Sequence, residues 1–336
     1  MPDADAPTSD DTEPDGETGE AGVAESARGA QGGGAADDDG ASAGARLAVR
    51  KTFKLYVGGA FPRSESGRSY EVRSAKDGAF LANAALASRK DARDAVVAAR
   101  AAYRKWSAAT AYNRGQVLYR VAEVLEGRHA QFVELVSQCE GLKRKAAVPV
   151  VDAAIDRWVW YAGWADKIAQ VDGSSNPVAG PYFAFSVPEP SGVAAVIAPQ
   201  RSSLLGLVSV VAPAIVAGGT CVVLASEAAP LAAVTLGEVL ATSDVPGGVV
   251  NVLTGRVAEV APWLALHGDV DCLDLTGVED EALATELEAG AATGLARVYR
   301  RPRDGGPDGE DWSADPGIRR IRHYLETKSV WHPAGV

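Results

Sequence analysis

The sequence predicts an α/β fold with a doubly wound parallel sheet and a layer of helices ahead of it in the chain. Five short apolar runs recur in the second half of the chain, and each of the first four is followed by a helical pattern. The runs are apolar throughout, which is typical of strands buried on both faces. A regular alternation of strand and helix then gives a parallel sheet with helices on both sides.

Ligands of such sheets bind at the carboxyl ends of the strands, so a site is expected just after the apolar runs. We interpret this region as a Rossmann-like domain. Its expected strands are Val193 to Ala198, Thr220 to Leu224, Val249 to Leu253, Val270 to Leu275 and Leu295 to Tyr299, with helices near 203–217, 230–242, 257–267 and 279–290.

A capping box predicts the start of the first long helix. Ser88 is followed three residues later by Asp91, and an alanine-rich stripe at intervals of three and four continues to Trp106. Pro149 fits the first turn of a later helix, where its missing N–H costs nothing. The other elements expected here are a short strand that runs into a glycine turn at 54–59, a strand at 69–73, and helices from about Arg114, from His129 to Leu142 and from near Pro149.

The remaining segments predict a hairpin, a linker and a short C-terminal element. A strand from Tyr182 to Val187 and a return strand near Gly192 are expected to form a hairpin at about 180–190. Residues after Arg300 are rich in Arg, Pro, Asp and Gly, a linker composition. The expected divisions are 1–46, 47–300, 301–317 and 318–336, the last holding a helix from Ile318 to Leu325 and a strand from Lys328 to Trp331.

The charge of the chain is concentrated at its beginning. Of the net charge of −11 over 336 residues, residues 1–46 contribute twelve acidic side chains against two arginines. The rest is nearly neutral, so it lacks the clustered basic surface that nucleic acid requires. Residues 1–46 carry almost no large apolar side chain and are predicted to be disordered, either as a solubilising extension or as an acidic docking arm.

The cysteines and the hydropathy exclude several further classes. Cys139, Cys221 and Cys272 are too few and too scattered for a disulfide framework, and none lies in a metal-binding pair. We therefore expect no metal site. The sequence shows neither a secretory signal nor an apolar run of about twenty residues, so we expect a cytoplasmic protein with no membrane partner.

Several ordered motifs together resemble the aldehyde dehydrogenase superfamily. They cover most of residues 54–300 and the last fifteen or so, and their combination is more specific than any one of them. The segments that carry the resemblance are Leu55 to Arg128, Pro188 to Val193, Ala217 to Leu224, Val245 to Gly255, His267 to Asp271 and Tyr324 to Trp331.

The resemblance implies a reaction for which this chain lacks the groups. The family oxidises aldehydes with a cysteine nucleophile, a glutamate base, an amide that holds the oxyanion, and a nicotinamide cofactor. The catalytic domain that holds the cysteine would lie between the fifth strand and the C-terminal strand, where only residues 301–317 are found, and no cysteine follows Cys272. The family's Pro-Trp-Asn is Pro199-Gln200-Arg201 here, and its base motif is replaced by residues 298–301. We expect a truncated member with no catalytic residue.

The cofactor motifs also differ from the family pattern. Glu227 is expected either to accept ribose hydroxyls or to be a solvated acid after a strand. Glu279, Asp280 and Glu281 are expected to cap a helix, where they would repel the diphosphate that this terminus otherwise attracts. Binding of NAD or NADP is therefore expected to be weak or lost. The full set of cofactor-binding candidates is Ala198, Pro199, Glu227, Gly255, Thr276 and Gly277.

Other conspicuous side chains favour structural interpretations. The four histidines, His129, His267, His323 and His332, have no catalytic partner at motif spacing and are expected to be satisfied at the surface. Trp158, Trp160 and Trp164 are expected to pack in the core or an interface.

Three functional hypotheses follow. The first is a catalytically silent homologue that oligomerises, with itself or with a full-length aldehyde dehydrogenase, as a structural or regulatory subunit. The resemblance implies that the hairpin and the C-terminal strand form the small β oligomerisation element, and exposed strand edges tend to acquire partners. The alternatives are an NAD(P)-dependent oxidoreductase that acts on aldehydes only with a complete partner subunit, and a dinucleotide-binding sensor.

Overall fold

The computed structural model describes residues 51–300 and 310–334. The chain divides into two compact units, residues 1–48 and 49–336, and every described residue belongs to the second. The acidic segment 1–46 and most of the expected linker, residues 301–309, lie outside the described residues. Predictions about them stay predictions.

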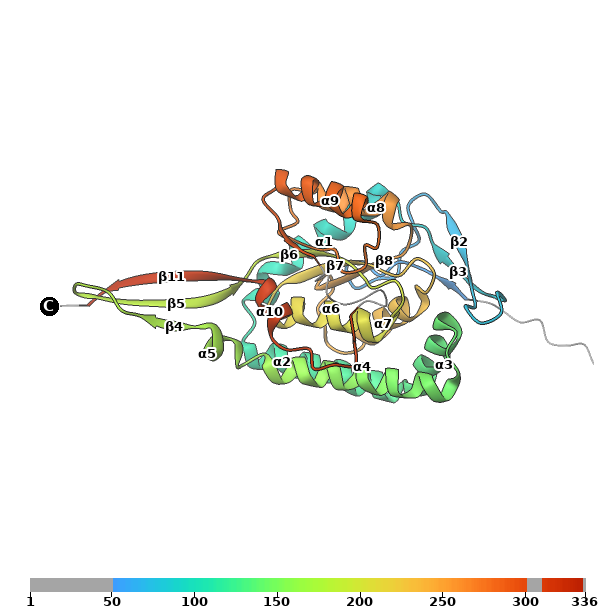
Figure 1. Ribbon diagram of the computed structural model, residues 1–336, viewed down its shortest axis with the longest axis horizontal. Coiled ribbons are helices and arrows are strands. Elements are labelled where there is room, and N and C mark those ends of the chain that lie inside the picture. The colour runs from blue at the N-terminus through green and yellow to red at the C-terminus, as the bar shows by residue number, and fades with distance from the viewer. Residues whose placement is uncertain (1–50, 301–309, 335–336) are drawn as a thin grey trace, which may run out of the picture. The chain divides into compact units, whose positions relative to one another are not determined.

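A five-stranded, fully parallel sheet forms the centre of the second unit, in the order β10-β9-β6-β7-β8 (Figure 1). All residues of its three middle strands are buried, as expected for runs that are apolar on both faces. The doubly wound α/β prediction is confirmed. The strands are β6 (Val193–Ile197), β7 (Thr220–Leu224), β8 (Val250–Leu253), β9 (Cys272–Asp274) and β10 (Arg297–Tyr299).

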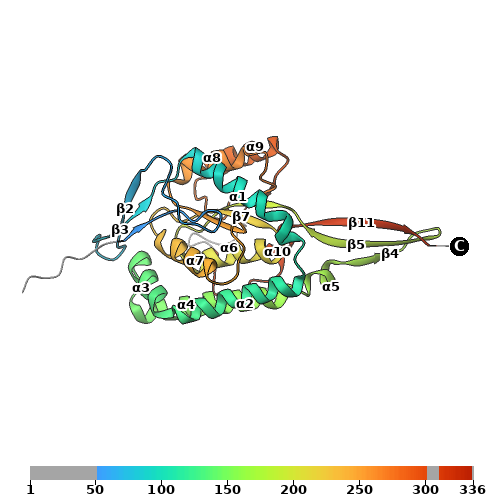
Figure 2. The same cartoon turned by 180° about the vertical axis from the view of Figure 1, so that it is seen from behind.

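Helices cover both faces of this sheet (Figures 1 and 2). One face packs against α1 (Arg89–Ser107), α8 (Val257–Ala265) and α9 (Glu281–Thr293). The other packs against α6 (Leu205–Val216) and α7 (Leu231–Ala241), with α2 (Ala111–Gly127), α3 (His129–Glu140) and α4 (Arg144–Trp164) as a further layer. Each face therefore has its own apolar core.

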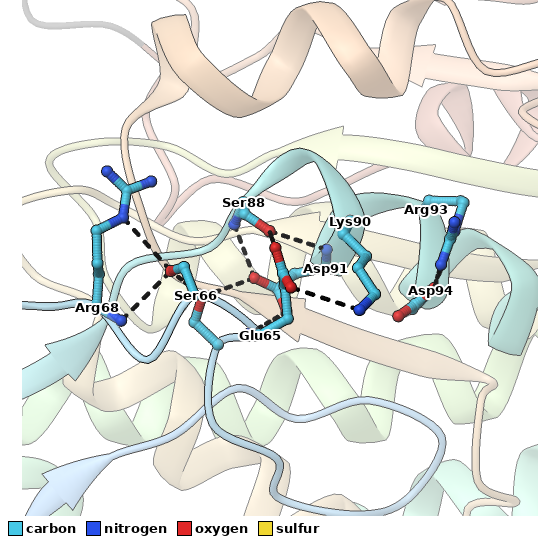
Figure 3. Close-up of polar contacts among 9 residues, drawn as sticks. Glu65, Ser66, Arg68, Ser88, Lys90, Asp91, Arg93 and Asp94 are labelled. Atoms are coloured by element: carbon cyan, nitrogen blue, oxygen red, sulfur yellow. Dashed lines mark hydrogen bonds and ion pairs between the residues drawn. The ribbon is translucent and has the colours of Figure 1, made fainter.

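The capping box at the start of α1 is present as predicted (Figure 3). The Ser88 hydroxyl accepts from the Asp91 N–H, and the Asp91 carboxylate accepts from the Ser88 N–H at 2.8 Å. The same carboxylate accepts from the Ser64 hydroxyl at 2.8 Å and from the Glu65 N–H at 3.0 Å. The cap thus also fixes the preceding loop.

The N-terminal strands differ from the prediction at 54–59. A small sheet has the order β1-β3-β2, with β1 (Thr52–Phe53), β2 (Ser69–Arg73) and β3 (Phe80–Ala85). The expected glycine turn is present, since Gly58 and Gly59 adopt positive φ, but the residues before it make only isolated bridges and no strand. Tyr56 makes an isolated antiparallel bridge to Val252 of β8.

The helix boundaries predicted after α1 need two corrections. Helix α2 starts at Ala111, where the Thr110 side chain accepts from the Asn113 N–H. Helix α4 starts at Arg144, so Pro149 lies inside it and not in its first turn. Helix α3 ends where predicted to within two residues, because Gly141 adopts a left-handed conformation at φ 72°.

The hairpin predicted at about 180–190 is a single strand. Strand β5 (Tyr182–Pro190) pairs antiparallel with β4 (Ser174–Asn176) before it and with β11 (Leu325–Pro333), in the order β11-β5-β4. The return strand expected near Gly192 is β6 of the parallel sheet. Helix α5 (Ile168–Asp172) precedes this second sheet, and α10 (Arg319–His323) leads into β11, which begins three residues earlier than predicted.

The capping cluster gives a stability prediction. Replacement of Asp91 by Ala should lower the free energy of unfolding by about 2 kcal/mol, because a buried carboxylate that accepts several hydrogen bonds is lost with the cap. Urea denaturation measures the change. Asp94→Ala is the matched control, since the Asp94 side chain is half exposed and pairs only with Arg93 in Figure 3; equal losses in the two variants would contradict the assignment.

Candidate functional site

The candidate site is the carboxyl edge of the parallel sheet, where the loops after β6, β7 and β9 meet. Gln200, in the loop after β6, links two of them. Its side-chain amide donates to the Ala198 carbonyl at 2.7 Å, and its oxygen accepts from the Glu227 N–H at 3.0 Å. Gln200 takes the place of the Trp in the family's Pro-Trp-Asn, and its side chain joins the two loops. Arg201 takes the place of the oxyanion-holding Asn, and its guanidinium lies 3.3 Å from Glu279.

Glu227 caps a helix instead of standing free in solvent. One carboxylate oxygen accepts from the Val257 N–H at 2.5 Å, at the start of α8, and the other lies 3.2 Å from Arg256. Both oxygens that would accept ribose hydroxyls therefore have partners within the chain. The contacts with Val257 and Arg256 also contradict the alternative interpretation of Glu227 as a solvated acid.

The turn after β9 is pressed against the loop after β6. The Gly277 N–H donates to the Ile197 carbonyl at 2.9 Å, and a Cβ at Gly277 would lie 1.8 Å from the Ala198 carbonyl oxygen. The Thr276 hydroxyl donates to Asp274, and the Thr276 N–H donates to the same carboxylate at 2.9 Å. The backbone N–H groups of Thr276 and Gly277 are thus both occupied.

The other two expected cofactor positions are structural in this arrangement. Pro199 is buried, and a Cβ on Gly206 would lie 3.0 Å from its ring. Gly255 has a φ of 153° and lies against the backbone of Ala87, whose N–H donates to the Thr254 carbonyl at 2.8 Å.

A buried ionic cluster fastens the C-terminal helix to this edge. Asp274, 1% exposed at the end of β9, accepts from Arg320 of α10 at 3.1 Å and from the Tyr324 hydroxyl at 2.8 Å. Arg320, 4% exposed, also donates to Glu310 at 2.5 Å and lies over the Tyr299 ring. Burial opposes the charge of Arg320, but both carboxylates outweigh it and hold its pKa above the ordinary value.

A second buried arginine holds the segment before α10. Arg157 of α4 donates to the Trp312 carbonyl at 2.6 Å, to the Ala314 carbonyl at 2.9 Å and to the Ser209 hydroxyl at 3.1 Å. The described part of the expected linker, from Glu310, is therefore fixed against α4 and α6.

The helix that would receive a diphosphate already has an acidic cap. The Asp280 carboxylate accepts from the Ala282 N–H at 2.8 Å and the Leu283 N–H at 3.3 Å, which confirms the capping interpretation for α9. Glu279 lies 3.3 Å from Arg201, so this ion pair joins the loops after β6 and β9.

All three cysteines are buried, and none forms a disulfide. Burial raises the pKa of Cys139 to about 12 and that of Cys272 to about 12, and it raises the pKa of Cys221 as well. A thiolate is the nucleophilic form, so none of these thiols is activated.

The aromatic prediction holds, and one histidine prediction is wrong. Trp158 is fully buried, and Trp160 packs on Trp164 at 5.5 Å between ring centroids. His323, expected at the surface, lies between the Tyr299 and Tyr324 rings, and its Nε2 has no hydrogen-bond partner. Within the described ranges, no helix is both long and apolar enough to span a membrane.

A model described as the aldehyde dehydrogenase family matches residues 61–297. The chain belongs to the aldehyde dehydrogenase family. It is 33% identical over 252 residues to retinal dehydrogenase 2 of Gallus gallus, covering 74% of this chain and 48% of that protein. It is 33% identical over 230 residues to aldehyde dehydrogenase family 2 member B4, mitochondrial, of Arabidopsis thaliana, covering 68% and 42%.

Solved aldehyde dehydrogenase structures share the fold. The structure of HpcC from Thermus thermophilus has a TM-score of 0.70 and 27% identity, and covers 74% of this chain and 47% of that one. An NAD+ complex of an aldehyde dehydrogenase from Bacillus cereus has a TM-score of 0.70 and 25% identity, and covers 74% and 50%. The chain spans about half the length of the curated relatives it matches.

The groups that would meet a dinucleotide do not fit one in the arrangement described. Glu227, Thr276 and Gly277 are bonded within the chain, and acidic side chains cap α8 and α9. A bound dinucleotide would have to displace those contacts before it could form its own.

Sequence reasoning missed the residues that organise this edge. Asp274, Arg320 and Arg157 belong to no family motif, yet all three are buried and paired. The sequence does hold one sign of the cluster, since Asp274 is a charged residue within an apolar strand run, and such a group requires a partner.

The ionic cluster gives a second stability prediction. Arg320→Met should cost about 3–5 kcal/mol of unfolding free energy, because it leaves the Asp274 carboxylate buried without its counter-charge. Arg322→Met is the matched control on the same helix, since Arg322 is exposed and its ion pair with Asp172 should contribute little to stability. Urea denaturation measures the free energy of unfolding of both variants. Comparable losses of unfolding free energy in the two variants would show that the cluster does not anchor α10.

His323 gives a prediction about pH. Burial lowers the pKa of His323 to about 4, whereas an unfolded histidine titrates near 6.5. Between these values only the unfolded chain takes up the proton, so His323 makes stability fall as pH drops from about 7 to 4. His323→Phe keeps the ring contacts and should flatten this part of the pH profile in urea denaturation; an unchanged slope would contradict the prediction.

Proposed function

We propose that this chain is a catalytically silent aldehyde dehydrogenase family protein that acts as a structural or regulatory subunit through oligomerisation. The observation that carries the proposal is the burial of all three thiols inside helices and strands. Without an accessible thiolate, the chain has no nucleophile to attack an aldehyde carbonyl by the family's covalent route.

The carboxyl edge of the sheet supports the same proposal. Two helix termini there are capped by the chain's own carboxylates, and Arg320 fixes the C-terminal helix next to the Thr276 turn. Displacing those contacts has a free-energy cost that any bound dinucleotide must meet. We therefore propose that NAD or NADP binding is weak or lost.

The second sheet supports the oligomerisation part of the proposal. Its strands expose large apolar side chains, including Tyr182, Phe183 and Trp331 at 45%, 54% and 59%. The Tyr182 and Trp331 rings lie on one face of the sheet, 5.8 Å apart between centroids, and Phe183 alternates to the other face. Exposed aromatic side chains on a sheet with open edges are typical of a contact surface between proteins. The partner is a second copy or a full-length aldehyde dehydrogenase.

A second candidate function is a dinucleotide-binding sensor, or an oxidoreductase completed by a partner subunit. It is favoured by the similarity to a Bacillus cereus aldehyde dehydrogenase whose structure is an NAD+ complex. In that case Glu227 would exchange its bond to the Val257 N–H for one to a ribose.

Dehydrogenase assays and calorimetry of the purified full chain test these functions. We expect no reduction of NAD+ or NADP+ with aliphatic or aromatic aldehydes, no heat at millimolar dinucleotide, and thiols that react with a disulfide reagent only after denaturant is added. A complete family member is the positive control. Turnover by the chain alone would overturn the proposal.

Two further outcomes would replace it with an alternative. Heat on dinucleotide addition that disappears in Glu227→Gln would establish the sensor. Turnover by the chain mixed with a homologue that keeps its catalytic cysteine but has a disabled dinucleotide site would establish the partner-dependent oxidoreductase, because this chain must then hold the cofactor.

A further inference from the structure

Strand β11 forms one edge of the β11-β5-β4 sheet and is open along its length. It runs for nine residues without a bulge, and six of its first eight side chains are exposed. No described strand pairs with its outer side. An open strand of this length is a template for pairing with another chain.

Two backbone hydrogen bonds show which groups of β11 face outward. The Ser191 N–H donates to the Tyr324 carbonyl at 2.9 Å, and the Ala334 N–H donates to the Pro181 carbonyl at 2.8 Å. Hydrogen-bonding residues alternate along an antiparallel strand, so the even-numbered residues face β5. The odd-numbered residues therefore turn their N–H and C=O groups to the open edge. Pro333 is odd-numbered, at a position where a missing N–H costs no bond to β5.

We propose that β11 pairs with β11 of a second copy of this chain, antiparallel and centred on Ser329. This inference rests on the proposed function, in which the chain acts by oligomerising. In this register Ser329 faces itself, and Thr327 faces Trp331 in both directions. Each outward N–H of these residues meets an outward carbonyl.

The ends of the pairing match as well. Leu325 faces Pro333 of the other copy, so the Leu325 N–H meets the Pro333 carbonyl. The Leu325 carbonyl would find no N–H on proline, but it already accepts from Arg297 at 2.7 Å. The register therefore leaves no outward backbone group of β11 without a partner.

The side chains agree with the same register. Asn176 donates to the Ser186 hydroxyl at 2.9 Å, which lies 3.0 Å from the Ser329 hydroxyl, so a polar row crosses the sheet and ends at the open edge. The two-fold axis continues that row into the second copy. Cross-strand hydroxyl pairs and aromatic pairs with a β-branched residue, such as Trp331 with Thr327, stabilise sheets.

Charge and backbone pairing disfavour the neighbouring registers. Centring on Ser329 places Glu326 opposite His332 and Lys328 opposite Val330, so no like charges face each other. Centring on Lys328 would place two lysines opposite each other, which is destabilising. Centring on Val330 would place the Thr327 carbonyl opposite Pro333, which has no N–H.

Disulfide trapping tests the register directly. In a hydrogen-bonded antiparallel pair facing Cα atoms lie about 5.5 Å apart, within the range that a disulfide bridges. Ser329→Cys should form a covalent dimer under mild oxidation. Thr327→Cys is the matched control, because the two Thr327 residues would be offset by four positions, about 13 Å along the strand. The three native thiols are buried and give little background.

A proline pair tests the pairing without a crosslink. Thr327→Pro removes an outward N–H but no bond to β5, and should convert a dimer of twice the 34.7 kDa chain mass into a monomer in light scattering. Ser175→Pro makes the same change at the outer edge of β4, where Ser175 lies between the two residues that face β5, and should leave the dimer intact. Circular dichroism and thermal melting show whether each variant is folded.

The results separate this inference from the proposed function. A wild-type monomer at all concentrations, a dimer that persists in folded Thr327→Pro, or crosslinking of Thr327→Cys as fast as Ser329→Cys would overturn the pairing. If Thr327→Pro does not fold, the cysteine pair decides alone. If Ser329→Cys forms the covalent dimer and that dimer turns over an aldehyde, the proposed function is wrong and the strand pairing still holds.

Discussion

The arrangement of the carboxyl edge depends on one constraint: Asp274 is a carboxylate at the end of a fully buried strand. A charge in that position requires a counter-charge and hydrogen-bond donors, which no neighbouring strand supplies. Thr276 donates two hydrogen bonds from the adjacent turn, and Arg320 and Tyr324 supply the counter-charge and a further donor from forty-six and fifty residues further along the chain. The position of α10, and of the strand that follows it, is a consequence of satisfying that one group.

The same edge shows how the described part of the chain satisfies the polar groups at the ends of its parallel strands. Polar groups left at the ends of parallel strands must find partners in any folded chain. Here they are the side chains of Gln200, Glu227 and Asp280, which bridge loops or cap helices. These hydrogen bonds hold the loops at the carboxyl edge together.

Local pattern predicted most of the elements but few of the contacts between them. β7 was predicted residue for residue, and the capping box at Ser88 was predicted with its partner, because both depend on neighbours in the sequence. Pairing of β5 with β4, and the position of Pro149 inside a helix, depend on tertiary packing that overrides local preference. The roles of Glu227 and Arg320 could not be predicted, because their hydrogen-bond partners lie thirty and forty-six residues away and produce no periodic pattern in the sequence.

Arg157 has a consequence for the covalent continuity of the chain. Its guanidinium donates hydrogen bonds to two carbonyls of the segment that begins at Glu310. That segment continues into α10, which is bonded to Asp274, and into β11, which pairs with β5. The segment from Glu310 onward is therefore joined to the rest of the described chain in two ways: by the peptide bonds that precede it and by hydrogen bonds and strand pairing of its own.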